Sequence, residues 1–205
     1  QWCSPTNKLK FSILELKNTI SNNEAPYLKL IFEHKIEYDS TVECLDFIND
    51  LNFFVILCFK EQLIFLKIIE ETQILNEYIF KITEFNKYNI NGTFVQLVVN
   101  RESKCIGILS VKNGVSIINL IDISGNLIFN YESQEVCTKI YLYGPTNEII
   151  ITYSHKITKI DIRQKKEILL CLSEQPSNVK EGFIFCSAYY FNNPKFFAAV
   201  TNNCC

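Results

Sequence analysis

The feature that most constrains this chain is a succession of short apolar runs, rich in Ile, Val, Phe, Tyr and Leu and separated by turn residues. Such runs favour β-strands, because β-branched and aromatic side chains pack well on a pleated surface. The runs that open successive groups of four begin at residues 42, 94, 136 and 183. Four antiparallel strands in about 40–50 residues are the signature of a β-propeller blade.

The second and third groups show this order most clearly. One reads FVQLVVN, KCIGILSV, GVSIINLI, NLIFNY, and the next reads VCTKIYLY, NEIIITYS, KITKIDI, KEILLCL. We therefore predict an all-β fold, a partial and degenerate WD-like β-propeller that occupies residues 1–205 as a single domain. Three full four-stranded blades are expected at about 42–80, 94–131 and 136–172, with partial blades at 11–34 and 183–201.

The segments between the runs carry turn residues. Lys112-Asn113-Gly114 and Ser124-Gly125-Asn126 favour tight turns, because Gly and Asn tolerate positive φ. Residues 60–85 fit either an amphipathic helix or two strands, and the neighbouring blades favour two strands. Two polar segments, Glu84–Gly92 and Ser173–Gly182, are interpreted as linkers between blades.

The length and the ends suggest a piece of a longer protein. A closed propeller of six to eight blades needs roughly 250–350 residues at this spacing, and the chain has 205 and contains no Met. No signal peptide is evident, and no apolar run is long enough for a membrane-spanning helix, so membrane insertion is not expected.

The charge balance argues against nucleic-acid binding. Lys and Arg together number 20 and Asp and Glu number 22, which gives a net charge of −2. Arginine occurs only at Arg101 and Arg163, so the chain lacks the basic surface that phosphate contacts require.

The nine cysteines are scattered along the chain rather than grouped. Six of them fall inside apolar runs, where buried free thiols in a reducing, cytoplasmic compartment are the expected state. These six are Cys44, Cys58, Cys105, Cys137, Cys171 and Cys186. No C-x-x-C pair occurs, and the adjacent Cys204 and Cys205 suit neither a tetrahedral metal site nor an ordinary disulfide.

The residue types that carry catalysis do not form a recognisable constellation. His155 is expected in a solvated turn with no Cys nearby in sequence, and Glu70-Glu71 is expected in a solvated turn between strands. Arg163 with Lys165-Lys166 is interpreted as a solubilising turn. The sequence therefore predicts no enzyme activity and no catalytic, cofactor-binding or metal-binding residues, so the expected cofactor is none.

One stretch resembles a known family. The run YDSTVECLDFINDLNFFVILCFKEQLIFLKI (38–68), with TFVQLVVN (93–100) and GILSVKNGVSIINL (107–120), is similar to the N-terminal β-propeller of the Rod (rough deal) kinetochore-associated family. The likeness covers about 80 of 205 residues, chiefly as hydrophobic pattern.

This resemblance implies a non-catalytic scaffold. Rod-family proteins join Zwilch and zeste-white-ten subunits in an outer-kinetochore complex that serves the spindle assembly checkpoint and recruits dynein. The implied partners are therefore Zwilch-like and zeste-white-ten-like subunits, and the implied location is the cytoplasm and, in mitosis, the kinetochore. No individual contact residue is carried over.

Two other readings stay open. The chain could instead be the propeller of another intracellular scaffold, such as a vesicle-tethering or trafficking subunit. A secreted or enzymatic β protein is the third reading. Thiol titration of the denatured chain would distinguish it, because nine free thiols favour a reducing compartment, whereas few or none would favour disulfides and secretion. The sequence does not indicate the total blade number, the partner-binding residues or the oligomeric state.

Overall fold

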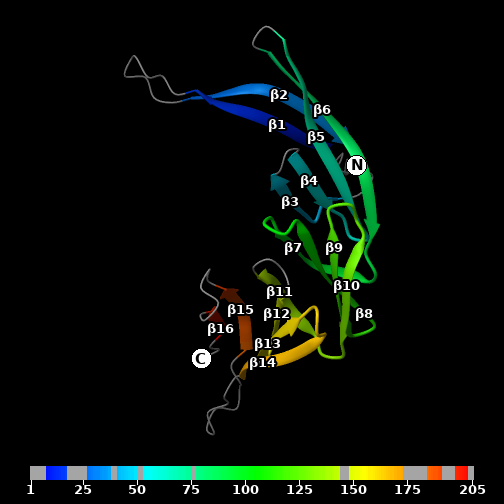
Figure 1. Cartoon of the computed structure of the whole chain (residues 1–205), viewed down its shortest axis with the longest axis vertical. Coiled ribbons are helices and arrows are strands. Elements are labelled where there is room, and N and C mark those ends of the chain that lie inside the picture. Colours follow the sequence, from blue (N-terminus) through cyan, green and yellow to red (C-terminus); the bar gives the residue numbers. More distant parts are fainter. Residues whose placement is uncertain are drawn as a thin grey trace, which may run out of the picture. The chain divides into compact units, whose positions relative to one another are not determined.

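A computed structural model describes residues 8–17, 27–37, 41–49, 53–74, 77–143, 148–172, 184–190 and 197–202. Every regular element in this part of the chain is a β-strand (Figure 1). The strands are β1 (Lys8–Lys17), β2 (Tyr27–Glu37), β3 (Cys44–Asn49), β4 (Phe53–Cys58), β5 (Gln62–Ile74), β6 (Glu77–Asn89), β7 (Thr93–Asn100), β8 (Cys105–Lys112), β9 (Val115–Asp122), β10 (Leu127–Ser133), β11 (Cys137–Tyr143), β12 (Glu148–Tyr153), β13 (Lys156–Asp161), β14 (Lys166–Leu172), β15 (Ile184–Tyr190) and β16 (Phe197–Asn202).

These strands form antiparallel sheets in which neighbours in sequence are neighbours in space. Three sheets have four strands, in the orders β3-β4-β5-β6, β7-β8-β9-β10 and β11-β12-β13-β14. Two further pairs, β1-β2 and β15-β16, are two-stranded. A four-stranded meander repeated along the chain is the construction of a propeller blade. The predicted fold class is confirmed: the chain is all-β, a partial and degenerate WD-like propeller.

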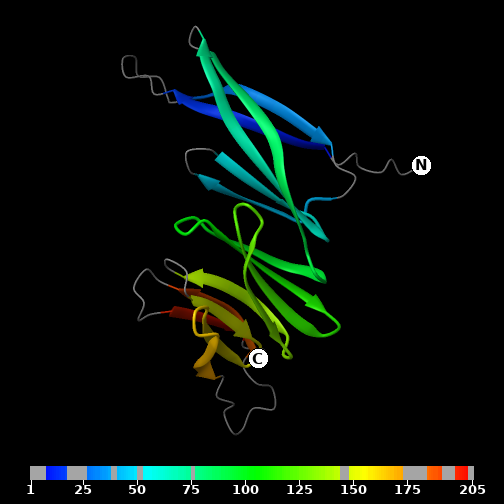
Figure 2. The same ribbon diagram turned by 45° about the vertical axis from the view of Figure 1, so that its right-hand side comes forward.

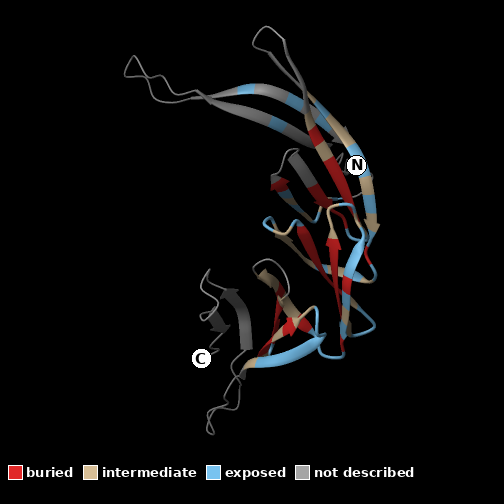
Figure 3. Cartoon of the chain, in the orientation of Figure 1, coloured by how far each residue is buried: buried red, intermediate tan, exposed pale blue. Residues whose placement is uncertain are grey.

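The middle strands of a sheet are buried over most of their length because both of their faces are covered. Six consecutive residues are buried in β8 (residues 105–110) and six in β9 (residues 116–121). The outer strand β10 alternates, and its buried residues are Phe129 and Ser133. Figure 3 shows this contrast, with buried positions concentrated on the middle strands.

The turn between β8 and β9 has the geometry that its residues predict. Lys112 pairs with Val115, so Asn113 and Gly114 alone form the loop. Both have positive φ, 53° and 80°, which is the requirement of a type I′ turn. This turn fixes the register of β8 against β9, and a one-residue slip would reverse the faces of their side chains.

The turn between β9 and β10 is held by one carboxylate. Asp122 Oδ1 accepts hydrogen bonds from the backbone N–H of Ser124 and of Asn126, each at 2.8 Å. Its Oδ2 accepts from Asn126 Nδ2 at 2.9 Å. Burial alone would raise the pKa of Asp122, but these hydrogen bonds lower it.

The chain divides into two compact units. The first contains residues 1–59 and 64–85, and the second contains residues 60–63 and 86–205. The core of the first unit is made by five buried side chains, with three partly buried ones packed against them. They are Leu57, Phe59, Ile64, Leu66 and Ile68, with Val42, Phe80 and Ile82.

The core of the second unit lies between two blades. Buried residues of β8, β9 and β10 form one cluster with buried residues of β11, β12 and β13. The sheets approach closely at Gly107, where an added Cβ would meet Ile140 Cδ1 at 3.2 Å and Leu142 Cδ1 at 3.3 Å. Figure 2 shows this unit with the β7–β10 and β11–β14 sheets face to face. Neither blade can bury both faces alone, so this stacking is what stabilises them.

Four expectations need comment. Residues 60–85 form strands, as the neighbouring blades predicted, but β5 and β6 are longer than expected. Glu70-Glu71 therefore lies within β5 rather than in a turn, and most of the expected linker Glu84–Gly92 belongs to β6. The second expected linker, Ser173–Gly182, lies outside the described residues. In the part of the chain that is described, no helix is long and apolar enough to cross a membrane.

Candidate functional site

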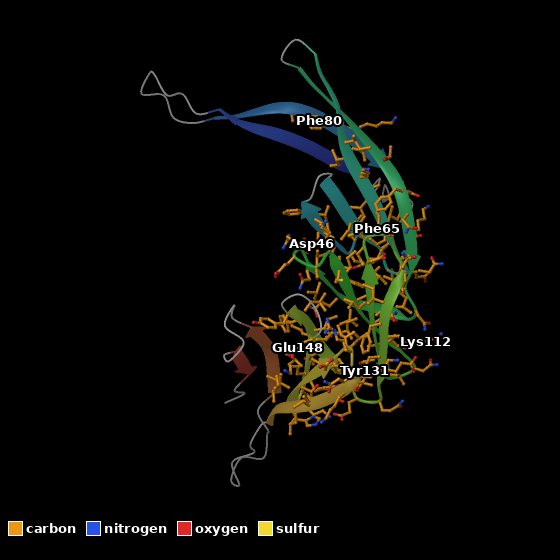
Figure 4. All side chains as sticks on the ribbon, in the orientation of Figure 1. Asp46, Phe65, Phe80, Lys112, Tyr131 and Glu148 are labelled. Atoms are coloured by element: carbon orange, nitrogen blue, oxygen red, sulfur yellow. The ribbon has the colours of Figure 1, made fainter. Side chains whose placement is uncertain are left out.

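The most developed polar cluster in the described residues lies between the outer strands of the two stacked blades. It contains two tyrosines, Tyr131 on β10 and Tyr153 at the end of β12, and Glu167 on β14. Figure 4 labels Tyr131 on its strand. The Tyr131 hydroxyl donates to Glu167 Oε2 at 2.6 Å, which is the short length typical of a hydrogen bond to a carboxylate. This bond joins the outer strands of two different sheets.

Tyr153 anchors the cluster from within. Its ring is 1 % exposed, so its hydroxyl requires a partner. That hydroxyl lies 3.3 Å from Glu167 Oε1 and 3.3 Å from the Oγ of buried Ser133. It can donate to the carboxylate while it accepts from Ser133. Glu167 therefore receives one phenol on each of its two oxygens.

A second carboxylate, a lysine and a histidine adjoin the cluster. Lys156 Nζ lies 2.5 Å from Glu135 Oε1 and 4.6 Å from the centre of the Tyr153 ring. His155 Nε2 lies 3.4 Å from Glu135 Oε2. The cation–π contact covers the face of the buried ring with the charged end of a side chain that is itself largely buried.

The electrostatics of the cluster favour an ionised glutamate and neutral tyrosines. Burial alone would raise the pKa of Glu167, but the hydrogen bond from Tyr131 and the charge of Lys156 lower it. Burial, and then the hydrogen bond to Glu167, raise the pKa of Tyr131 to about 12. Burial also raises the pKa of Tyr153 far above its ordinary value. At neutral pH the phenols keep their protons and donate them to the carboxylate.

Side-chain to backbone bonds connect the same two sheets away from this cluster. Ser116 Oγ on β9 accepts from the backbone N–H of Cys137 on β11 at 2.8 Å. Gln96 Oε1 on β7 accepts from the backbone N–H of Ile140 at 2.8 Å. These bonds satisfy donors on β11, whose ladder partner is β12. The blades are thus joined by specific polar contacts as well as by apolar packing.

The hydroxyl groups of this cluster find their hydrogen-bond partners within it. Both tyrosines and the serine lie between strands, and their hydroxyl groups are taken up by one another and by Glu167. Among the described residues, no three His, Cys, Asp or Glu side chains gather in a way that could hold a metal ion. What the cluster does is fix the outer strands β10 and β14 relative to each other.

Those outer strands present apolar side chains to solvent. Leu127 and Ile128 on β10 are 54 % and 49 % exposed. Ile168 and Leu169 on β14 are 41 % and 51 % exposed. Each strand is the last of its sheet in the described chain, so each also has an open backbone edge. We call these two exposed pairs, one on each edge strand, the outer-edge patch.

The residues that the sequence singled out do not meet in one site. His155 lies in the exposed turn between β12 and β13, as predicted, and Arg163 and Lys165 lie in the exposed turn before β14. Cys58, Cys105 and Cys137 are buried, but Cys44 is only partly buried, which corrects the expectation for that residue. The side chains of His34, Cys171 and Cys186 lie outside what is described.

Sequence reasoning missed the tyrosine–glutamate cluster entirely. Tyr131 and Glu167 are 36 residues apart and lie in different groups of strands. One sequence signal pointed toward the cluster. Ser133 and Tyr153 lie in or beside apolar runs, and a hydroxyl group that is buried there requires a hydrogen-bond partner.

Comparison with known proteins gives structural similarity only. No protein-family profile and no curated protein matches the chain. Among solved structures, apo AztD from Citrobacter koseri is 16 % identical with a TM-score of 0.47 over 83 % of this chain and 46 % of that one. A second AztD structure from that species gives 15 % and 0.47. The WD40 domain of SCAP from fission yeast gives 11 % and 0.45 over 79 % of this chain and 38 % of that one. The chain therefore spans less than half the length of each of these chains.

Proposed function

We propose that this chain is part of a non-catalytic protein-interaction scaffold. The observation that carries the proposal is the outer-edge patch, in which two neighbouring edge strands expose apolar side chains beside an open backbone edge. Exposed apolar surface on a fixed framework favours protein contacts, and an open edge can add a strand from a partner.

The finer proposal is that the scaffold is a Rod-like subunit of an outer-kinetochore complex. It is supported by the sequence resemblance over 38–68, 93–100 and 107–120. The partners would then be Zwilch-like and zeste-white-ten-like subunits, and the protein would act in the spindle assembly checkpoint and in dynein recruitment. It would be cytoplasmic and reach kinetochores in mitosis.

The contact surface can be tested with two charge-matched variants of the full-length protein. Leu127→Glu with Ile128→Glu places two carboxylates in the outer-edge patch. Gln134→Glu with Gln164→Glu adds the same charge at two exposed positions outside the patch. Quantitative co-purification should show that the first variant loses a Zwilch-like subunit at least tenfold and that the second retains it. Equal retention by both variants would exclude the patch as the contact surface.

The Rod-like reading has a separate test. The tagged full-length protein should accumulate at unattached kinetochores in prometaphase and leave along spindle microtubules after attachment. A steady membrane or Golgi signal without kinetochore enrichment would exclude this reading and favour a trafficking scaffold.

A further inference from the structure

Two cysteines of the first unit face each other across neighbouring strands. Cys44 on β3 pairs directly with Cys58 on β4, and the six residue pairs of this ladder run from Cys44↔Cys58 to Asn49↔Phe53 without a register shift. Residues that are directly opposite in an antiparallel pair project from the same face of the sheet. The two thiols are therefore brought together by the backbone itself.

The spacing of such a pair suits a disulfide. Directly opposed residues have Cα atoms about 4.5–5.5 Å apart, and disulfides span Cα separations of about 4.4–6.8 Å. Each thiol shifts the pKa of the other, and the Cys58 thiol also donates to the backbone carbonyl of Phe59 at 3.5 Å. The Cys58 carbonyl also accepts the backbone N–H of Glu43 at 2.8 Å, which holds the start of β3 against the end of β4.

The pair is asymmetric in a way that assigns each thiol a role. Cys44 is partly exposed, whereas Cys58 is 0 % exposed. The hydrogen bond from Cys58 lowers the pKa of Cys44, although burial and the charges of Asp46 and Glu43 act in the opposite direction. The same bond raises the pKa of Cys58. Cys44 is thus the accessible thiol with the greater thiolate character, and Cys58 is the protected one.

We propose that Cys44 and Cys58 form a reversible dithiol–disulfide site that reacts with small-molecule disulfides of the glutathione class. The Cys44 thiolate attacks one sulfur of oxidised glutathione, which forms a mixed disulfide and releases one glutathione thiolate. Cys58 then loses its proton and attacks the Cys44 sulfur, which expels the second glutathione thiolate. The protein loses two protons and two electrons in total, and one oxidised glutathione becomes two reduced ones.

The other cysteines with described side chains lack this arrangement and serve as internal controls. Cys105 lies opposite Asp122 and Asn100, and Cys137 lies opposite Tyr153. Both are buried, and burial raises the pKa of Cys137. Neither should react under conditions that oxidise the Cys44–Cys58 pair.

The experiment follows from the tryptic map. No Lys or Arg lies between Lys35 and Lys60, so one tryptic peptide, 36–60, contains both Cys44 and Cys58. The purified 205-residue chain is equilibrated with reduced and oxidised glutathione in graded ratios, in buffer and in urea. It is then acid-quenched, alkylated, digested and analysed by mass spectrometry.

In buffer, peptide 36–60 should become unlabelled and lighter by about 2 Da, the mass of the two hydrogens lost in oxidation. The peptides with Cys105 and Cys137 should remain alkylated at the same ratios. The equilibrium constant for closing the disulfide should be at least tenfold larger in buffer than in urea, because only the folded ladder holds the thiols together. Cys58→Ser should stop at a glutathione adduct on Cys44, and Cys44→Ser should leave Cys58 alkylated.

Four results would overturn the proposal. The first two are alkylation of both thiols at every glutathione ratio, and equal equilibrium constants for disulfide closure in buffer and in urea. The others are a persistent glutathione adduct on Cys44 in the wild-type chain, and a disulfide from either residue to a different cysteine.

Discussion

Replacing Tyr131 with Phe isolates the hydrogen bond that joins the two outer strands. The variant keeps the ring and removes only the hydroxyl that donates to Glu167 Oε2 at 2.6 Å. Hydrogen bonds to charged groups contribute about 1.5–3 kcal/mol when they are well shielded. Glu167 is exposed, so solvent screening reduces the expected loss to about 1 kcal/mol.

The pH dependence of this loss has a definite sign. The pKa of Glu167 is lowered in the folded state relative to its ordinary value of 4.5. A carboxyl with a lowered folded pKa contributes stability that is present above 4.5 and is lost as the pH falls through the folded value. The difference in free energy of unfolding between wild type and Tyr131→Phe should therefore be largest near neutral pH and should become smaller in acid.

Urea unfolding followed by circular dichroism at neutral and acid pH measures both quantities. Tyr88→Phe is a suitable control, because burial alone raises the pKa of Tyr88 and no carboxylate partner contributes. Tyr131→Phe should lower the free energy of unfolding by about 1 kcal/mol more than the control at neutral pH. Equal losses in the two variants, or a difference that does not change with pH, would refute the reasoning.

Two substitutions and one titration test the contacts between the blades. Gly107→Val should destabilise the second unit by about 1–3 kcal/mol, because even a Cβ at this position lies 3.2 Å from a side chain of β11. Thermal unfolding measures this loss, and an unchanged midpoint would mean that the sheets can separate there without cost. Ser116→Ala should cost about 1–3 kcal/mol in urea unfolding, since it leaves the buried N–H of Cys137 without its acceptor; a neutral result would indicate that another acceptor replaces Ser116. An ultraviolet absorbance titration should show Tyr131 ionising near its raised pKa of about 12. The stability that this tyrosine contributes should be lost as the pH rises above 10. Ionisation with a pKa near the ordinary value of 10 would contradict its contact with Glu167.

Local patterns predicted the strands because the information that forms them is local. The run 114–121 is mostly apolar, with Ser116 and Asn119 as its polar members, and it forms a middle strand with six consecutive buried residues. The adjoining Asn113-Gly114 pair predicted the tight turn that the positive φ angles confirm. The blade pattern also resolved residues 60–85 in favour of strands, although the ends of β5 and β6 extend further than the pattern indicated.

The contacts between strands could not be predicted in the same way. The pairing of Cys44 with Cys58 depends on the register of β3 against β4, and a shift of one residue would separate the two thiols. The bond from Tyr131 to Glu167 depends in addition on how two sheets stack. Neither register nor stacking is encoded in the spacing of apolar residues, so both clusters emerge only from the three-dimensional structure.

The polar cluster and the outer-edge patch are physically connected, and this gives a final prediction. Tyr131 lies on the strand that carries Leu127 and Ile128, and Glu167 immediately precedes Ile168 and Leu169 on the other strand. The hydrogen bond between Tyr131 and Glu167 therefore fixes the position of one half of the patch relative to the other. A partner that contacts both edge strands benefits from this preorganisation, because less ordering is required on binding.

Tyr131→Phe should then lower the affinity for such a partner even at temperatures where the variant remains folded. The same substitution should have no effect on a partner that contacts only β10. Titration of the purified partner against the wild type, Tyr131→Phe and Tyr88→Phe separates these cases, with circular dichroism to verify folding. Weaker binding by Tyr131→Phe alone would mean that the partner spans both blades. Equal binding by all three proteins would restrict the contact to one edge strand and would exclude preorganisation of the patch by the cluster.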